Sequence, residues 1–254
     1  MDDLDLIIDL HADGPRQGPG GDAETRLAIR LSGLTASANL RIADIGCGTG
    51  AVARTLTAAL DATVVAVDCV PAFLDRLAAC SQTGADQTGA GRIETVEASM
   101  DALPFEDGAF DAIWSEGAIY NMGFEAGITA WRRHLKPGGV LAVSELTWFT
   151  GDRPPELERH WLEQYSEVAT ASAKLAALEA SGYAPLGYFP LPEHCWLDNY
   201  YRPMQARFGQ FLARNGDSEA ARALVAAEEA EIDLYERYSA YFGYGYYVAR
   251  RIAA

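Results

Sequence analysis

The sequence predicts an α/β fold in which helices cover a largely parallel sheet, and three observations lead to this prediction. Short β-branched runs alternate with helical stretches between residues 40 and 149, which is the pattern of parallel strands joined by crossover helices. A turn with glycine at alternate positions, Gly46, Gly48 and Gly50, joins the first of these strands directly to a helix. The 254 residues, 49% of them hydrophobic, are also sufficient to bury a core of this kind.

The charge and the cysteine content exclude several classes of protein. Lysine and arginine number 20 against 36 acidic residues, so the formal charge is −16, which opposes binding to nucleic acid or to an anionic membrane. No apolar run approaches the roughly 18 residues of a membrane span, and the acidic N-terminus does not resemble a secretory signal. The four cysteines are too scattered for a disulfide framework or a metal-binding pair. We therefore expect a cytoplasmic protein without a metal site, with a small-molecule substrate and an oligomeric state that the sequence leaves open.

The first 149 residues contain the expected parallel sheet. Residues 1–39 form an N-terminal arm, with a helix from near Asp22. Strands are expected where β-branched and apolar residues run together, at residues 40–45, 63–67, 92–96, 110–115 and 140–145. Helices are expected between them at residues 51–60, from Pro71 at a favoured first-turn position, and at residues 124–135, where Pro137 and two glycines would end the helix.

The remaining residues, 150–254, have longer helical stretches and most of the tyrosines. Ten of the twelve tyrosines lie beyond residue 182, which indicates a surface that is both flat and partly polar. Helices are expected at residues 155–167, 169–181, 196–215 and 218–239, and strands at residues 183–191 and 241–249. No repeat or low-complexity linker interrupts the chain. We therefore expect a single domain, with residues 40–149 as a cofactor-binding core and residues 150–254 on the substrate side.

The glycine-rich turn indicates a ligand that touches the backbone. Residues without a Cβ atom allow a strand to turn at once into a helix while a ligand lies against the main chain. Asp68 follows the next strand, 22 residues after Gly46, at the position where a carboxylate accepts hydrogen bonds from a ribose diol. The turn and the acid together predict a site for an adenosyl group.

Two readings of this turn remain open at the level of the motif. Residues 46–51 also satisfy the loose dinucleotide pattern Gly-x-Gly-x-x-Gly/Ala, so an NAD-dependent oxidoreductase of Rossmann type is an alternative. Asp44, two residues before the first glycine, and a further acid at Asp101 favour another ligand. A pyrophosphate gains nothing from a carboxylate at the strand tip, whereas a ligand that carries an ammonium or a sulfonium does.

Five segments in a fixed order resemble the motifs of class I S-adenosylmethionine-dependent methyltransferases. The likeness covers residues 40–149 and is carried by residues 44–50 (Asp-Ile-Gly-Cys-Gly-Thr-Gly), 67–68, 98–105, 110–114 and 135–139. A narrower resemblance to bacterial small-molecule methyltransferases of unassigned substrate includes residues 17–20, 114–124, 143–149, 191–196 and 241–244. The family implies a Rossmann-like, doubly wound, seven-stranded sheet with an antiparallel last strand, an N-terminal arm and helical insertions.

The resemblance also implies which residues hold S-adenosylmethionine. Gly46, Gly48 and Gly50 would line its methionine portion, Asp44 would help to hold the ammonium, and Asp68 would bind the ribose hydroxyls. Asp101 and the backbone of Met100 correspond to the adenine-contacting segment, with Cys69 as a small apolar wall. Two further neighbours complete the expected cofactor set: Cys47 and Ser115. Gln17 to Gly20 would form a lid over the bound cofactor, although a plain surface loop is the simpler alternative.

The acceptor side is less defined by the sequence. Methyl transfer is an in-line displacement that depends chiefly on alignment and on the removal of water, so no base is compulsory. If the acceptor is a hydroxyl or a carbon acid, Glu116, Glu145 and His194 are the candidate bases. An aromatic acceptor pocket is expected from five side chains, of which Tyr120 is also placed with the catalytic groups: Trp114, Tyr120, Trp148, Tyr200 and Tyr201. The other histidines, His11, His134 and His160, are too far apart to suggest a metal site, and His134 is expected on a helix surface.

The expected function is therefore transfer of a methyl group from S-adenosylmethionine to a small molecule, with release of S-adenosylhomocysteine. Three alternatives stand beside it: a related enzyme that uses a carboxylated form of the cofactor, an oxidoreductase, and a non-catalytic module that binds S-adenosylmethionine. The motifs leave the acceptor atom open between sulfur, nitrogen, oxygen and carbon.

Overall fold

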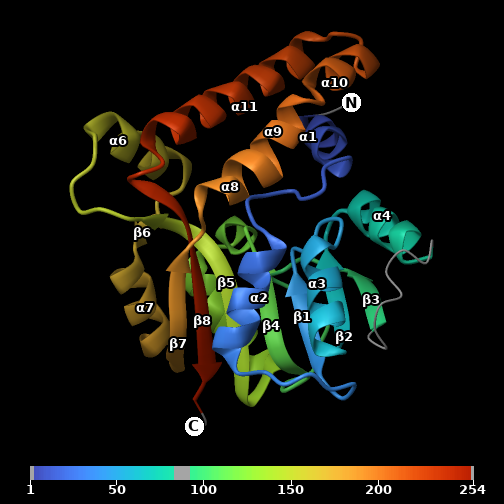
Figure 1. Ribbon diagram of the computed structural model, residues 1–254, viewed down its shortest axis with the longest axis vertical. Coiled ribbons are helices and arrows are strands. Elements are labelled where there is room, and N and C mark those ends of the chain that lie inside the picture. The colour runs from blue at the N-terminus through green and yellow to red at the C-terminus, as the bar shows by residue number, and fades with distance from the viewer. Residues whose placement is uncertain (1–2, 83–91, 253–254) are drawn as a thin grey trace.

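The computed structural model describes residues 3–82 and 92–252 and contains one large sheet (Figure 1). Its main path runs in the order β3-β2-β1-β4-β5-β8-β7. The strands are β1 (Arg41–Ile45), β2 (Thr63–Asp68), β3 (Arg92–Glu97), β4 (Phe110–Glu116), β5 (Leu135–Trp148), β7 (Tyr183–Pro190) and β8 (Phe242–Arg251). The pairs from β3 to β5 are parallel, whereas β8 is antiparallel to both β5 and β7. A two-residue strand, β6 (Ala169–Thr170), pairs with β5 off this path. The predicted doubly wound sheet with an antiparallel last strand is confirmed.

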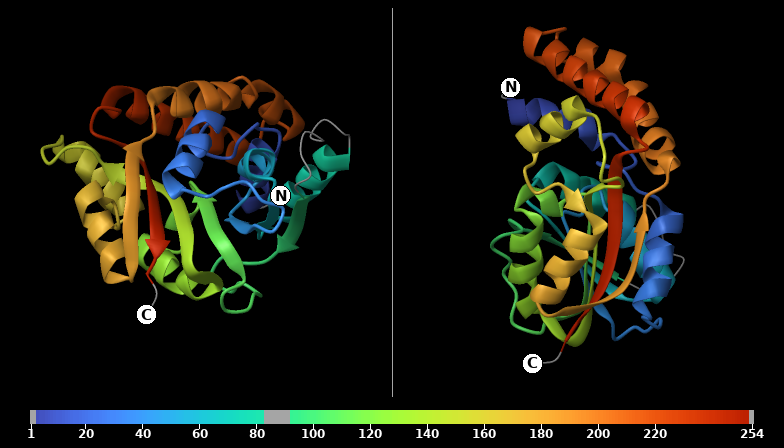
Figure 2. Two further views of the ribbon diagram at one scale, coloured as in Figure 1. Left: turned by 60° about the horizontal axis from the view of Figure 1, so that its bottom comes forward. Right: turned by 90° about the vertical axis from the view of Figure 1, so that its left-hand side faces the viewer.

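Helices cover both faces of the sheet, because successive side chains point to opposite faces and nearly all of them are buried in the inner strands. On one face, α2 (Asp22–Ser32), α3 (Ala51–Leu60) and α4 (Pro71–Gln82) pack with Ile42 and Trp114 in one apolar cluster. On the other face, α5 (Phe124–Trp131) and α7 (Ala171–Ala180) pack with Ile45 and Leu141 in a second cluster. The right-hand view of Figure 2 shows these two helical layers on either side of the strands.

A helical cap lies over the end of the sheet at which the parallel strands finish (Figure 1). It contains α1 (Asp3–Ala12), α6 (Pro155–Gln164), α8 (Glu193–Trp196), α9 (Arg202–Gln205), α10 (Phe208–Arg214) and α11 (Glu219–Tyr238). Aromatic packing joins the cap to the sheet: the Trp196 ring stacks on Tyr235 of α11 at 4.5 Å and meets Tyr244 of β8 at 4.8 Å. Among the described residues, no helix has the length and the apolar character needed to cross a membrane.

Two of the expected helices, and the expected position of His134, differ from what the structure shows. The helix expected at residues 124–135 ends at Trp131, because a 3-10 turn, Arg132–His134, leads directly into β5 at Leu135. The helix expected at residues 196–215 is divided into α8, a π-helical turn (Leu197–Tyr201), α9 and α10. His134 is 6% exposed rather than on a helix surface, and its Nδ1 lies 3.3 Å from the carbonyl oxygen of Glu106.

The strand expected at residues 140–145 is longer than predicted, and this extension changes the position of a candidate residue. β5 continues to Trp148 because β8 pairs with it over its whole second half, from Val140 with Arg250 to Trp148 with Phe242. Glu145 therefore lies inside a paired strand and does not close it. The expected division into residues 1–39, 40–149 and 150–254 stays a prediction, and residues 1–2, 83–91 and 253–254 of it lie outside the described part.

Candidate functional site

The glycine-rich turn lies where β1 ends, against the carboxyl end of β2. The amide nitrogens of Gly46 and Cys47 both donate to the carbonyl oxygen of Val67, at 2.8 and 3.0 Å. Gly48 has a φ of +53°, and a Cβ atom there would lie 2.3 Å from Oε1 of Gln17. The left-handed backbone favours glycine at this position, and the Gln17 side chain lies directly against it.

Asp68 lies at the tip of β2 and braces this turn. Its Oδ2 accepts a hydrogen bond from the amide of Gly48 at 2.8 Å, and its Oδ1 accepts one from the amide of Val70 at 2.9 Å. Burial raises the pKa of Asp68, whereas these backbone donors lower it. A carboxylate offers about four lone-pair positions, so two bonds to the backbone leave acceptor capacity for hydroxyl groups of a ligand.

Asp44 is the most deeply buried acid next to the turn. It is 1% exposed, and its Oδ2 makes no hydrogen bond to any described residue. Burial raises the pKa of Asp44 well above its usual range, and the carboxylates of Glu116 and Asp68 raise it further. An unpaired buried carboxylate is costly, so a cation bound here would restore a favourable electrostatic balance.

Glu116 ends β4 on the same face of the sheet and is held by three partners. Its Oε2 lies 3.3 Å from a guanidinium nitrogen of Arg16, while its Oε1 accepts hydrogen bonds from the hydroxyls of Thr25 at 2.6 Å and Tyr246 at 2.8 Å. The side chain is only 4% exposed. Tyr246 in turn accepts a bond from Trp114 Nε1 at 2.5 Å. This network fixes Glu116 as an anchor for the N-terminal arm.

The N-terminal arm covers the glycine turn. Oε1 of Gln17 accepts hydrogen bonds from the amide and the hydroxyl of Thr49, at 2.8 and 3.1 Å, and its Nε2 donates to the carbonyl oxygens of His11 and Gly14. The arm and the turn enclose a cavity of about 60 Å³, which reaches from Arg16 and Gln17 to Asp44 and Glu116. That volume holds water but no nucleoside, since ligand pockets measure about 300–1,000 Å³.

Glu145 lies on the other face of the sheet, among residues of the second layer of helices. Its Oε1 accepts from the amide of Leu146 at 2.9 Å and lies 3.7 Å from Nζ of Lys174, and its Oε2 has no described hydrogen-bond partner. Burial raises the pKa of Glu145 to about 7, although the Lys174 ammonium lowers it. Burial in turn lowers the pKa of Lys174. The pKa of Glu145 thus lies near neutral pH, which is the range that suits a general base.

The structure separates the candidate acceptor-binding aromatics into core and surface residues. Trp114 and Tyr201 are fully buried, and Trp148 is 4% exposed and lies under the guanidinium of Arg153 at 4.5 Å. Tyr120 is 43% exposed and meets Tyr165 edge to face. The remaining member, Tyr200, stacks on His11 at 6.1 Å. Tyr120 is therefore the one most accessible to a ligand.

The expected adenine-side residues form a more open rim. Cys69 and Asp101 are exposed, while Met100 is half-buried and its carbonyl oxygen accepts a bond from Trp131 Nε1 at 2.8 Å. Cys47 is 7% exposed and lines the cavity under the arm. Ser115 is fully buried, and its hydroxyl has no described partner.

His194 lies in α8 of the cap, and its described contacts are with Glu24 and Cys195. Its Nε2 is 3.5 Å from Glu24 and 3.7 Å from the sulfur of Cys195. Four contact residues were not singled out in the sequence because their partners are distant along the chain: Arg16, Thr25, Lys174 and Tyr246. The Gln17-Gly-Pro-Gly segment was the one signal that pointed to the arm.

A larger surface groove lies at the opposite, amino-terminal edge of the sheet. It measures about 570 Å³ and is lined by Asp107, Pro137 and three arginines, Arg132, Arg133 and Arg251. Each arginine already bonds a carboxylate or a carbonyl oxygen. The groove is thus remote from the acids of the glycine turn, which lie at the carboxyl edge where ligands of such sheets bind.

Comparison with known proteins supports the same region. Residues 42–139 match a protein family described as a methyltransferase domain. A malonyl-[acyl-carrier protein] O-methyltransferase of Dechloromonas aromatica is 33% identical over 126 residues, which are 48% of this chain and 43% of that protein. A demethylmenaquinone methyltransferase of Clavibacter sepedonicus is 34% identical over 170 residues, which are 65% of this chain and 63% of that protein. The chain thus spans less than two thirds of the length of either relative.

Solved structures share the fold over nearly the whole chain. A SAM-dependent methyltransferase from Geobacter sulfurreducens superposes with a TM-score of 0.82 at 18% identity, covering 96% of this chain and 97% of its own. The [4+2]-cyclase SpnF superposes with a TM-score of 0.77 at 22% identity, covering 99% and 94%. These likenesses extend the shared fold to the N-terminal arm and the helical cap.

Proposed function

We propose that this chain, of which residues 42–139 match a methyltransferase-domain family, is a class I enzyme that transfers the methyl group of S-adenosylmethionine to a small-molecule acceptor. The observation that carries the proposal is the arrangement of Asp44 and Asp68 on either side of the glycine turn. One acid has an unpartnered buried oxygen, and the other keeps spare acceptor capacity. This pair suits a ligand with an ammonium at one end and a ribose at the other.

The residues present fit the cofactor in chemical character. Asp44 would accept the ammonium group, Asp68 the ribose hydroxyls, and the exposed Asp101 the adenine amino group. When bound, the cofactor supplies a methyl group on a positively charged sulfur. Asp44, Asp68 and Glu116 place three carboxylates around that end of the site, with Arg16 as their only close cation among the described residues. Their combined field favours a sulfonium over a phosphate.

Binding requires the N-terminal arm to move. The cavity of about 60 Å³ is too small for an adenosyl ligand, and the Gln17 side chain lies against Gly48, where the cofactor would contact the backbone. We infer that Gln17 leaves the turn when the cofactor enters and that the arm then closes over it. Closure would exclude water from the reacting centre, which favours a displacement at a charged sulfur.

Glu145 is the best candidate for a base if the acceptor must lose a proton. It is buried, its pKa is raised to about 7, and one of its oxygens has no described partner. Glu116 is better suited to an electrostatic role, because three donors already hold its carboxylate. Tyr120 is the accessible aromatic that we place at the entrance for the acceptor.

A second candidate function is supported by one specific observation. A cyclase has the same fold over nearly the whole chain, so the architecture also serves proteins whose reaction is not named for methyl transfer. The relatives themselves are named for different acceptors, malonyl-[acyl-carrier protein] and demethylmenaquinone. A module that binds the cofactor without transferring its methyl group is therefore the alternative, ahead of an oxidoreductase.

Two measurements test the proposal. In thermal-shift titrations we expect S-adenosylhomocysteine, but not NAD, to raise the unfolding temperature; stabilisation by NAD alone would contradict the cofactor assignment. Release of S-adenosylhomocysteine is then followed across a panel of thiols, amines, phenols and carboxylic acids. Turnover with one class identifies the acceptor, whereas tight binding without turnover on any class favours the non-catalytic module.

A further inference from the structure

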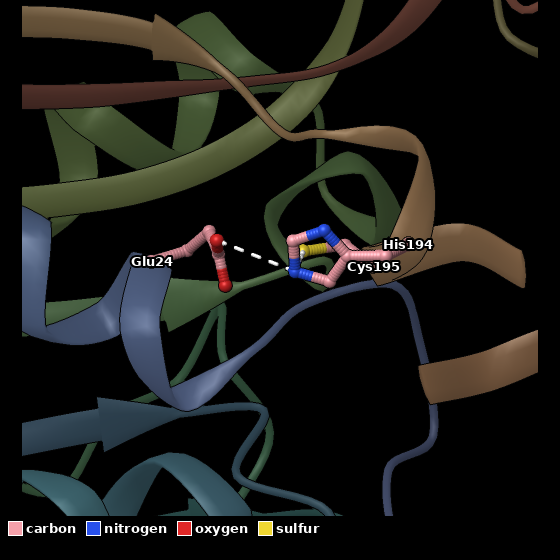
Figure 3. Close-up of side chains that lie close together, drawn as sticks. All are labelled: Glu24, His194 and Cys195. Atoms are coloured by element: carbon pink, nitrogen blue, oxygen red, sulfur yellow. Dashed lines mark hydrogen bonds and ion pairs between the residues drawn. The ribbon is translucent and has the colours of Figure 1, made fainter. Parts of the chain in front are cut away.

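Three side chains with metal-binding atoms converge where the N-terminal arm enters α2. Glu24 lies in the first turn of α2, and His194 and Cys195 are neighbours in α8. Their ligand atoms all lie within 4.8 Å of one another. Figure 3 shows the Glu24 carboxylate facing the His194 ring, with a dashed line between them, and the Cys195 side chain drawn next to the ring. The cluster combines one oxygen, one nitrogen and one sulfur.

The two distances from Nε2 of His194 are close to the edges of a tetrahedral metal site. A Zn²⁺ ion with a Zn–S distance of about 2.3 Å and Zn–N and Zn–O distances of about 2.0–2.1 Å holds sulfur about 3.5 Å from nitrogen and nitrogen about 3.3 Å from oxygen. In the structure, Nε2 of His194 lies 3.7 Å from Sγ of Cys195 and 3.5 Å from Oε1 of Glu24. Small side-chain movements would bring these atoms to bonding distance.

Burial of the cluster provides an independent argument. Glu24 is 8% exposed, and its Oε2 makes no hydrogen bond to a described residue although it lies among the cluster. Cys195 is fully buried. A buried, incompletely paired carboxylate beside a buried thiol is unfavourable unless a cation neutralises it. The His194 side chain is 48% exposed, so it provides both an entry path and room for a water as fourth ligand.

The same three residue types also occur in nucleophilic cysteine sites, but the geometry here is different. In such a site one nitrogen of the imidazole contacts the nucleophile and the other contacts the carboxylate. Here Nε2 makes both contacts, so the ring does not connect the two groups in series. A ligand set gathered around one point fits better.

We propose that Glu24, His194 and Cys195 bind a divalent metal ion of borderline softness, for which Zn²⁺ is the natural choice. The ion joins α2 to α8 beside Gly20 and Gly21, the residues that directly precede α2. The amide of Gly20 already donates to the carbonyl oxygen of Cys195 at 3.3 Å, and a Cβ atom at Gly21 would lie 2.2 Å from Oε2 of Glu24. The metal thus fixes the residues that follow Gln17, the side chain that covers the glycine turn. This inference does not depend on the proposed methyl transfer.

The test uses the full chain after removal of metals with a chelator. Zn²⁺ is titrated in competition with a chromophoric chelator, and Co²⁺ is added separately to follow absorption from a thiolate–cobalt bond. We expect one equivalent of each metal to bind and the cobalt spectrum to show thiolate ligation. Cys195→Ser should abolish that absorption, and His194→Asn should weaken Zn²⁺ binding by more than the 10–100-fold typical of lost outer-shell partners.

Matched controls separate the site from other side chains. Cys80→Ser removes an exposed thiol of α4 and His160→Asn removes a histidine of α6, and both should keep the wild-type affinity. Because His194 is half-exposed, His194→Asn should keep its unfolding transition even if Cys195→Ser does not. Absence of a one-equivalent site in the wild type, or equal Zn²⁺ affinity in His194→Asn and wild type, would overturn the proposal.

Discussion

The Gln17 side chain is bonded to the glycine turn through Thr49, with Oε1 of Gln17 2.8 Å from the Thr49 amide nitrogen. The two residues are 32 positions apart and belong to the arm and to the turn, respectively. This contact places a protein amide in the space where the proposed cofactor meets the backbone. The arm therefore covers the site and also competes with the proposed cofactor for contact with the glycine turn.

Replacement of Gln17 by alanine should make the site easier to enter. Gln17→Ala removes the bonds to Thr49, so we expect S-adenosylhomocysteine to associate faster in stopped-flow measurements. The substitution also removes the two bonds to His11 and Gly14, four bonds in all, so the free protein should lose about 2–6 kcal/mol of stability at about 0.5–1.5 kcal/mol for each hydrogen bond. Gln210→Ala, on the exposed side of α10, is the control. An association rate equal to that of the wild type would show that Gln17 does not obstruct entry.

Replacement of Asp68 should weaken cofactor binding. Asp68→Ala removes an acceptor for the ribose hydroxyls, and we expect S-adenosylhomocysteine affinity measured by calorimetry to fall by about 1.5–3 kcal/mol. Asp68 also braces the turn through Gly48, so Asp68→Asn serves as a second variant that keeps the shape of the side chain. Asp75→Ala, an exposed acid on α4, is the control. Unchanged affinity in both Asp68 variants would exclude the ribose role.

Glu145 should make stability depend on pH. Its pKa is about 7 in the folded chain against an ordinary value of 4.5, so the folded state retains a proton that the unfolded state has lost between these values. The stabilising effect of that proton is complete below about pH 4.5 and is lost as the pH rises through 7. The difference corresponds to about 3 kcal/mol. Urea unfolding between pH 4.5 and 8 should show this loss in the wild type and not in Glu145→Gln.

Glu145 and Glu116 should differ in their effects on turnover. If the acceptor needs a base, activity of the wild type should rise with pH with a midpoint near 7, and Glu145→Gln should remove that rise and lower kcat by about 10²–10⁴-fold. Glu116→Gln should keep the pH profile, because its carboxylate is already held by Arg16, Thr25 and Tyr246. A profile that persists in Glu145→Gln would assign the midpoint to another group.

The cofactor half of the fold was predictable because its signals are local. The turn between the strand and the helix within residues 40–60 has glycine at alternate positions. The position of Asp68 was predictable because it ends the next strand, one crossover unit later. The bounds of β1, β2 and β3 differ from the expected ones by one residue. The helix expected from residue 196 is divided, and Pro203 in the first turn of α9 is a local signal for one of the breaks. The contacts of Trp196 with Tyr235 and Tyr244 were not predictable, since they join residues that are distant along the chain.

The sequence by itself determined the class of fold, the glycine turn and the acids that flank it, because backbone conformation and hydrophobic period are properties of neighbouring residues. Only the tertiary structure decided what those acids contact. Glu116 is held by Arg16, which is 100 residues away, and Glu145 lies inside β5 because β8 pairs along it. Glu24 likewise lies close to His194 and Cys195 only through tertiary packing, since these residues are distant along the chain. Burial and partner choice depend on long-range packing, and these set the pKa of each carboxyl group and thereby its role.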